Sequence, residues 1–134
     1  MFLNQLKPEE KELFLELSAN AVMANGEFDQ DELETVAKLC YEMMMPNHLP
    51  DTNKPLDVIL EEINEMATVQ ERNIIVFELF TLLGSDENHD SKEMDYMDYV
   101  AYKLEVNDDK YQHLRSLSRL RELLNKELNT AICR

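Results

Sequence analysis

Glycine and proline are scarce in this chain of 134 residues, which contains two glycines and four prolines. All-β domains need many tight turns, and these two residues form most of such turns. Their scarcity argues against a sandwich or a barrel and favours an all-α fold. The hydrophobic fraction of 44% suffices for a core, so the composition also differs from that of a disordered segment.

Cysteine is also rare, and the two cysteines, Cys40 and Cys133, do not form a CxxC motif. This excludes the spacing of a zinc ribbon or of a thioredoxin-like site and fits two free thiols in a reducing compartment. The longest apolar run, "IIVFELFTLL", is too short to cross a bilayer, and the first residues become polar too soon for a signal peptide. We therefore expect a cytoplasmic protein without membrane insertion.

Basic residues are few, with 13 Lys and Arg against 28 Asp and Glu, for a formal net charge of -15. Such a charge repels nucleic acid and anionic membranes, so we expect no nucleic-acid partner. The charge is uneven, because residues 1–102 hold 6 basic against 23 acidic residues, and residues 103–134 hold 7 against 5. The acidic part suits a cation or a basic protein partner.

Signatures of common enzymes are missing as well. The sequence has no G-x-S-x-G, no H-E-x-x-H and no glycine-rich phosphate loop. None of the three histidines follows a glutamate by three positions, as the ligands of di-iron bundles do. We therefore predict that the protein is not an enzyme. A hydrolase or redox enzyme with a non-standard site is the weaker alternative.

What the chain does contain is apolar spacing of three and four residues, which is typical of helices. Caps and prolines place their ends: Pro8 suits a first helical position, Thr68 and Glu71 form a capping box, and Asn107 caps the last helix. Tyr41 and Met44 are expected on the apolar face of the second helix, which Pro46 ends. The predicted helices are about 8–24, 30–45, 55–66, 69–83, 91–105 and 108–130. The apolar side of the last helix carries Leu114, Leu117, Leu120, Leu124 and Leu128.

An internal repeat organises these helices. "LFLEL" at residues 13–17 matches "IVFEL" at residues 75–79 with an offset of 62, and three polar positions match with an offset of 61. The unit is a helix, an acidic loop and a capped helix, found at about 8–45 and 69–105. We predict one domain over residues 1–134, an all-α bundle of six to seven helices built from two pseudo-symmetric helical hairpins. The matched polar pairs are Asn25 and Asp86, Asp29 and Asp90, and Glu32 and Glu93.

The first acidic loop, "ANGEFDQDE" at residues 24–32, resembles the A-D-G-x-x-x-x-x-E signature of TerB-like domains, the helical family associated with tellurite resistance. Ala24, Gly26 and Glu32 match, and Asn25 stands where the family usually has Asp. The resemblance covers about residues 13–104. It implies an internally duplicated all-α bundle, a divalent-cation site lined by loop carboxylates, and a role in bacterial stress response or signalling rather than catalysis.

Two interpretations of the acidic loops remain open. In the first, loop oxygens bind Ca²⁺, Mg²⁺, Mn²⁺ or Zn²⁺, and His89 serves if the ion is a transition metal. The candidate metal ligands are Asp86, Asp90, Glu93, Asn25, Asp29 and Glu32. In the second, the acids only cap helix N-termini, where carboxylates stabilise free N–H groups. Capping leaves Asp86 and Glu27 unexplained.

Two further glutamates, Glu16 and Glu78, occupy equivalent positions in the repeat, and Glu78 interrupts the most apolar helix. A buried glutamate must be paired or neutral. We expect Glu78 to lie on the one polar stripe of its helix, with a polar anchor near the inter-repeat axis as the alternative. Taken together, the sequence predicts a non-enzymatic binding or signalling module with a protein partner and a divalent-cation site; the alternative is a metal-free structural or protein-interaction domain.

Overall fold

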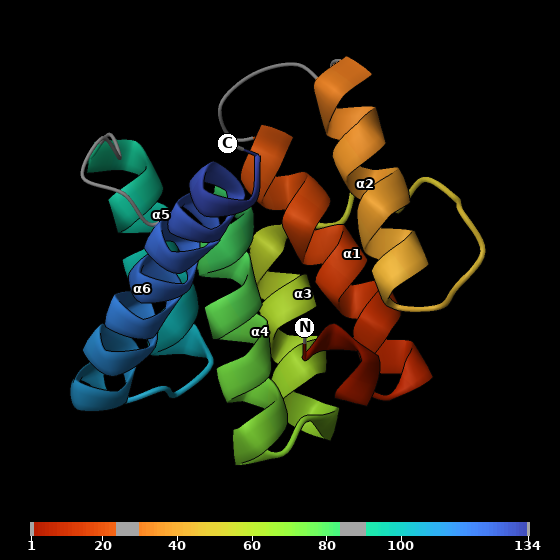
Figure 1. The fold of residues 1–134 in the computed structure, drawn as a ribbon. Coiled ribbons are helices and arrows are strands. Elements are labelled where there is room, and N and C mark those ends of the chain that lie inside the picture. The colour runs from red at the N-terminus through yellow and green to blue at the C-terminus, as the bar shows by residue number, and fades with distance from the viewer. Residues whose placement is uncertain (1, 24–29, 84–90, 134) are drawn as a thin grey trace. The chain divides into compact units, whose positions relative to one another are not determined.

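We describe a computed structural model of the chain, which covers residues 2–23, 30–83 and 91–133 (Figure 1). Within these ranges every regular element is helical, so the all-α prediction is confirmed. A short 3-10 helix, η1, precedes six α-helices. They are η1 (Leu3–Gln5), α1 (Pro8–Met23), α2 (Gln30–Glu42), α3 (Leu56–Met66), α4 (Val69–Leu83), α5 (Ser91–Lys103) and α6 (Asp108–Ile132).

The chain divides into two compact units, Met1–Ile75 and Val76–Arg134, and α4 runs through the boundary. In the first unit, α1 lies between α2 and α3 and packs against both (Figure 1). Its apolar stripe meets that of α3, where Ile59, Leu60 and Ile63 are fully buried at the predicted spacing of three to four residues. Phe14 is the largest buried side chain of α1.

In the second unit, the later part of α4 packs with α6. The ring of Phe80 on α4 stacks on that of Tyr111 on α6, with 5.2 Å between the ring centroids. Met97, Val100 and Leu104 on α5 are fully buried. Among the described residues, no helix has both the length and the apolar character that a membrane span requires.

The helix starts follow the predicted local caps. The Thr68 amide donates to Oε1 of Glu71 at 2.8 Å, and the Glu71 amide donates to the Thr68 hydroxyl at 3.2 Å. The Lys110 amide donates to Oδ1 of Asn107 at 2.8 Å, which starts α6. These hydrogen bonds confirm both predicted caps. The caps could be predicted from the sequence because a cap joins residues only three positions apart.

The end of α2 differs from the prediction. The helix ends at Glu42, before Pro46, because Met44 adopts a left-handed conformation with φ of 58°. The Met45 amide donates to the Cys40 carbonyl and the Met44 amide to the Tyr41 carbonyl, both at 3.0 Å, which is a Schellman motif. Tyr41 and Met44 are each 84% exposed, so their predicted place on the apolar face is wrong.

The same ending recurs at α5. Glu105 has φ of 60°, and the Val106 amide donates to the Ala101 carbonyl at 3.0 Å. Glu105 follows Met44 by 61 residues, and the starts of α1 and α4, the starts of α2 and α5, and the ends of α2 and α5 are related by the same offset. The helix bounds therefore repeat as the sequence repeat predicts.

Candidate functional site

Most of the predicted cation ligands lie outside the described residues. This applies to Asn25, Glu27, Asp29, Asp86, His89 and Asp90, and to the side chains of Glu32 and Glu93. Among the side chains that the structure does describe, no group of three or more His, Cys, Asp or Glu residues is arranged to hold a metal ion. The cation site therefore stays a prediction, and Glu16 and Glu78 are the predicted polar positions whose side chains the structure describes.

Glu78 is buried, with 3% of its surface exposed, so its expected place on a polar stripe of α4 is wrong. The guanidinium of Arg121 on α6 donates from Nη1 to Oε1 of Glu78 at 3.2 Å. A buried carboxylate needs such a partner, because transfer of an isolated charge out of water is very unfavourable. Glu78 is thus a buried polar anchor of α4, and Arg121 is its cation.

Arg121 joins further groups of the same unit. Its Nη2 donates to the Thr81 hydroxyl at 2.7 Å, and its guanidinium lies 4.7 Å from the centre of the Phe77 ring. The Thr81 hydroxyl is also 3.3 Å from the buried hydroxyl of Ser118. A planar guanidinium suits this combination of a carboxylate, a hydroxyl and an aromatic face. The network fixes α6 on α4.

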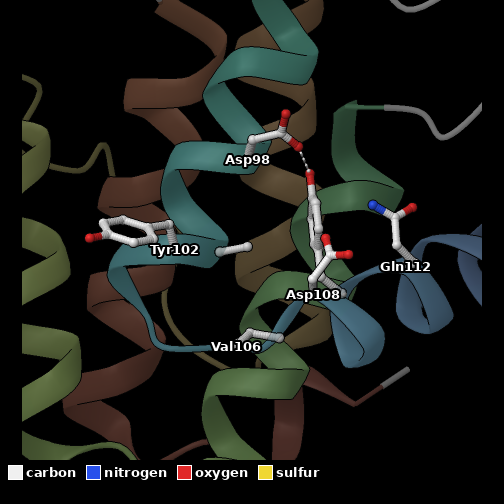
Figure 2. A pocket seen from close by; sticks show the side chains of 7 residues that line it. Asp98, Tyr102, Val106, Asp108 and Gln112 are labelled. Atoms are coloured by element: carbon white, nitrogen blue, oxygen red, sulfur yellow. Dashed lines mark hydrogen bonds between the residues drawn. The ribbon is translucent and has the colours of Figure 1, made fainter.

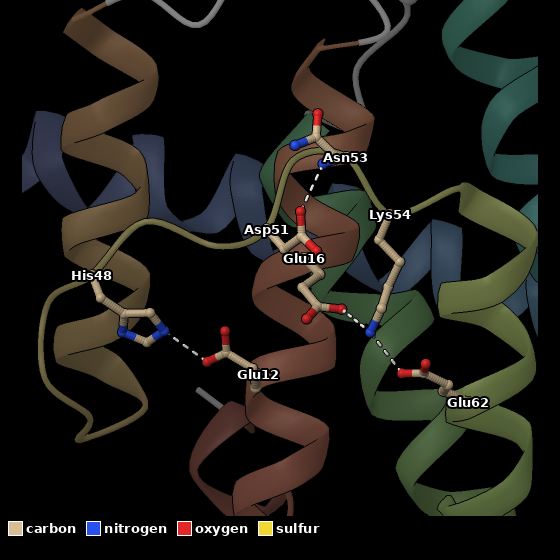
Figure 3. Close-up of polar contacts among 7 residues, drawn as sticks. All are labelled: Glu12, Glu16, His48, Asp51, Asn53, Lys54 and Glu62. Carbon is tan, nitrogen blue, oxygen red and sulfur yellow. Dashed lines mark hydrogen bonds and ion pairs between the residues drawn. The ribbon is translucent and has the colours of Figure 1, made fainter.

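Glu16, the counterpart of Glu78 in the repeat, is also mostly buried, with 8% exposed. Lys54, in the loop between α2 and α3, donates from Nζ to Oε2 of Glu16 at 2.9 Å and to Oε2 of Glu62 at 2.8 Å (Figure 3). The hydrogen bond to Glu16, followed by that to Glu62, raises the pKa of Lys54. One ammonium group therefore connects the loop, α1 and α3.

The same loop contacts α1 a second time through His48. Its Nε2 lies 2.7 Å from Oε2 of Glu12, and its Nδ1 lies 2.8 Å from the Pro46 carbonyl (Figure 3). Both neighbours are acceptors, so the imidazole satisfies them together only when both nitrogens carry protons. The Pro46 carbonyl, and then Glu12, raise the pKa of His48. The loop is thus attached to α1 at two charged points.

Sequence reasoning missed these three basic partners. Arg121 pairs with a residue 43 positions away, Lys54 with one 38 positions away and His48 with one 36 positions away. Such separations leave no periodic pattern. The rarity of basic residues could have indicated Lys54, because it is one of only six Lys and Arg residues among the first 102. A cation that is rare in an acidic chain and lies in a proline-rich loop is a good candidate partner for a buried acid.

A cavity of about 270 Å³ lies where α5 meets α6 (Figure 2). Inside it, the Tyr111 hydroxyl donates to Oδ1 of Asp98 at 2.6 Å. Burial, and then this hydrogen bond, raise the pKa of Tyr111. Pockets for drug-sized ligands usually hold about 300–1,000 Å³, so this one is small. Tyr111 already stacks on Phe80 and donates a hydrogen bond to Asp98. We therefore assign the cavity a structural role.

A row of exposed apolar side chains lies on α6. Its packed side carries the buried Tyr111 and Ser118. At 100° per residue, a second row of side chains lies between about a quarter and about half of a turn away around the helix. We name this row the leucine stripe. It consists of Leu117, Leu120, Leu124 and Leu128, which are 42%, 60%, 59% and 47% exposed.

The described polar clusters thus connect helices, whereas the leucine stripe is exposed. Larger patches of exposed apolar surface are typical of interaction sites. Comparison with known proteins found no matching family model, no matching curated protein and no matching solved structure.

Proposed function

We propose that this chain is a non-enzymatic binding module, whose leucine stripe on α6 holds a basic amphipathic helix of a protein partner. The observation that supports this is the exposure of four leucines in one row, beside the side through which α6 packs. Rows spaced by three and four residues are the surfaces that amphipathic helices recognise. Burying them against a partner removes apolar surface from water.

The charge of this chain indicates which class of partner the leucine stripe binds. Asp109 and Glu127 border it on one side in a helical projection, and both are exposed. Residues 103–134 hold 7 basic against 5 acidic residues, but the whole chain has a net charge of -15, and this overall charge attracts a basic partner and opposes association of two copies. We therefore assign the surface to a partner helix with an apolar face and Lys or Arg beside it, rather than to a second copy.

The TerB-like resemblance supports the same class of function, since it implies a signalling or stress-response module rather than an enzyme. Cation binding by Asp86, Asp90 and Glu93 with Asn25, Asp29 and Glu32 belongs to this proposal as an additional property. The repeated spacing of these acids supports it. The metal-free interaction domain remains the alternative, and its partner surface would be the same.

A designed peptide tests the proposed surface directly. An 18-residue helical peptide with leucines on one face and lysines beside them is titrated into the protein by calorimetry, with amide chemical shifts as a map. We expect binding that shifts residues 113–128 and weakens with salt. Leu120→Ser/Leu124→Ser should weaken binding at least tenfold, and a peptide with glutamates in place of lysines should bind more weakly than the lysine peptide.

Val58→Ser/Val69→Ser is the matched control, because these two exposed valines lie elsewhere in the chain. It should bind the peptide like the wild type. Equal binding by the leucine variant and the wild type would overturn the proposal. A dimer in sedimentation that Leu120→Ser/Leu124→Ser dissociates would instead assign the stripe to a second copy and contradict the proposed occupant.

A further inference from the structure

Glu10, in the first turn of α1, has a completely buried carboxyl group. Its Oε1 accepts the Lys7 amide at 3.0 Å, which closes the N-terminus of the helix. Its Oε2 is buried too, and the described residues offer it no hydrogen-bond donor. A buried acceptor without a donor is unfavourable. It is satisfied if the oxygen itself carries a proton and donates.

The acceptor for that proton is Glu71, in the first turn of α4. The carboxyl groups of Glu10 and Glu71 both lie within 4.0 Å of the same Lys7 ammonium, so they are close neighbours, and a carboxylate of Glu71 can accept a proton that Glu10 donates. Oε1 of Glu71 already accepts the Thr68 amide at 2.8 Å. The capping glutamates of two helices thus meet at one ammonium group.

Lys7 is the cation of this cluster. Its Nζ lies 3.4 Å from Oε1 of Glu71 and 4.0 Å from Oε1 of Glu10, and donates to the Met66 carbonyl at the end of α3 at 3.0 Å. Lys7 and Glu71 are the charged groups that act on Glu10. With one shared proton the three side chains are neutral in sum; without it they carry one negative charge in a buried place.

The environment assigns the proton to Glu10. Burial, and then the hydrogen bond with Glu71, raise the pKa of Glu10. Burial also acts to raise the pKa of Glu71, but the Thr68 amide and hydroxyl, Glu10 and Lys7 outweigh it and lower this pKa to about 2. Two carboxyl groups in contact normally separate in this way, because both cannot be ionised at low cost.

We propose that Glu10 and Glu71 form a buried proton-binding site, which ties the first turn of α1 to the junction of α3 and α4 and loosens when its proton leaves. Loss of the proton places two carboxylates in contact with only Lys7 between them. The segment that loosens is η1 with the first turn of α1, because it is short. This property concerns other helices than the leucine stripe and goes beyond the proposed binding function.

The sign of the pH effect follows from Glu10. Because its pKa in the folded chain lies above the ordinary 4.5, its contribution to stability is complete below about pH 4.5 and is lost as the pH rises through the folded pKa. Glu71 contributes in the opposite sense, since its stabilisation is lost only as the pH falls toward about 2. Raising the pH from 5 to 9 should therefore loosen the junction.

The test compares the full-length wild type with Glu10→Gln, which keeps the size of Glu10 and donates permanently to Glu71. We expect the melting temperature of the wild type to fall relative to Glu10→Gln as the pH rises from 5 to 9, by several degrees. Other titrating groups, His48 included, are common to both proteins and cancel in the difference. Glu9→Gln, at the exposed neighbouring position, should follow the wild type.

Two NMR measurements on the wild type test the site without any variant. The carboxyl carbon of Glu10 should titrate clearly above pH 4.5, and hydrogen exchange at the Lys7 and Thr68 amides should accelerate over the same range. Titration of Glu10 at or below its ordinary pKa would overturn the proposal. A melting-temperature difference between wild type and Glu10→Gln that does not change with pH would do the same.

Discussion

The guanidinium of Arg121 on α6 donates to the buried carboxylate of Glu78 on α4, with 3.2 Å between Nη1 and Oε1. Glu16 occupies the equivalent position 62 residues earlier and accepts from Lys54 at 2.9 Å. Each half of the repeat therefore keeps a buried glutamate at the same place in its first helix. The neutralising cations come from unrelated elements, a loop in one half and the last helix in the other.

The first prediction concerns the pair of Arg121 and Glu78. Arg121→Met should lower the free energy of unfolding by about 3 kcal/mol, because it removes the cation from a buried carboxylate. Denaturant titration at pH 7 measures the change. Lys126→Met, which removes the same charge from an exposed position of α6, should cost less than about 0.5 kcal/mol. Equal effects of the two variants would contradict the assigned pair.

Lys54 allows a second prediction. Lys54→Met should destabilise the chain by about 1–2 kcal/mol, between the values of exposed and of buried ion pairs, because Glu16 is largely buried and Glu62 is not. A double-mutant cycle with Glu16→Gln measures the coupling. Lys38→Met on the exposed side of α2 is the control. Additive effects in the cycle would show that Lys54 and Glu16 do not interact.

A third prediction uses His48. Its pKa in the folded chain lies above 6.5, so its stabilising effect is complete below that pH and is lost as the pH rises through the folded value. The ring is exposed, and the effect should stay below about 1 kcal/mol. Proton NMR should find the pKa above 6.5, and lower in Glu12→Gln. An unchanged pKa in Glu12→Gln would mean that this ion pair is not formed.

The predicted cation site leads to a fourth expectation. If the loop acids bind a divalent ion, adding Ca²⁺, Mg²⁺, Mn²⁺ or Zn²⁺ after EDTA treatment should raise the melting temperature as ln(1 + [L]/Kd). A concentration of 100 times Kd corresponds to about 2.7 kcal/mol. The rise should vanish in Asp86→Asn/Asp90→Asn. The absence of any shift with all four ions at millimolar concentration would exclude the site.

Local chemistry explains what could be predicted about the fold. The helix starts at Val69 and Asp108 agree with the sequence because their caps join residues three positions apart, and the start at Pro8 agrees because proline suits a first helical position. The repeat was readable for the same reason, since its loop acids and caps recur at a fixed offset. The end of α2 could not be predicted, because Met44 adopts the left-handed conformation there in place of the glycine that normally marks such an ending.

The sequence by itself determined the helical class, most helix bounds and the duplicated pattern, because these depend on spacing within one or two helical turns. Only the tertiary structure decided that Glu78 is buried against Arg121, that Glu10 meets Glu71, and that α6 leaves its leucines exposed. These facts depend on which distant side chains the packing of helices brings together. No periodicity within a helix encodes that choice.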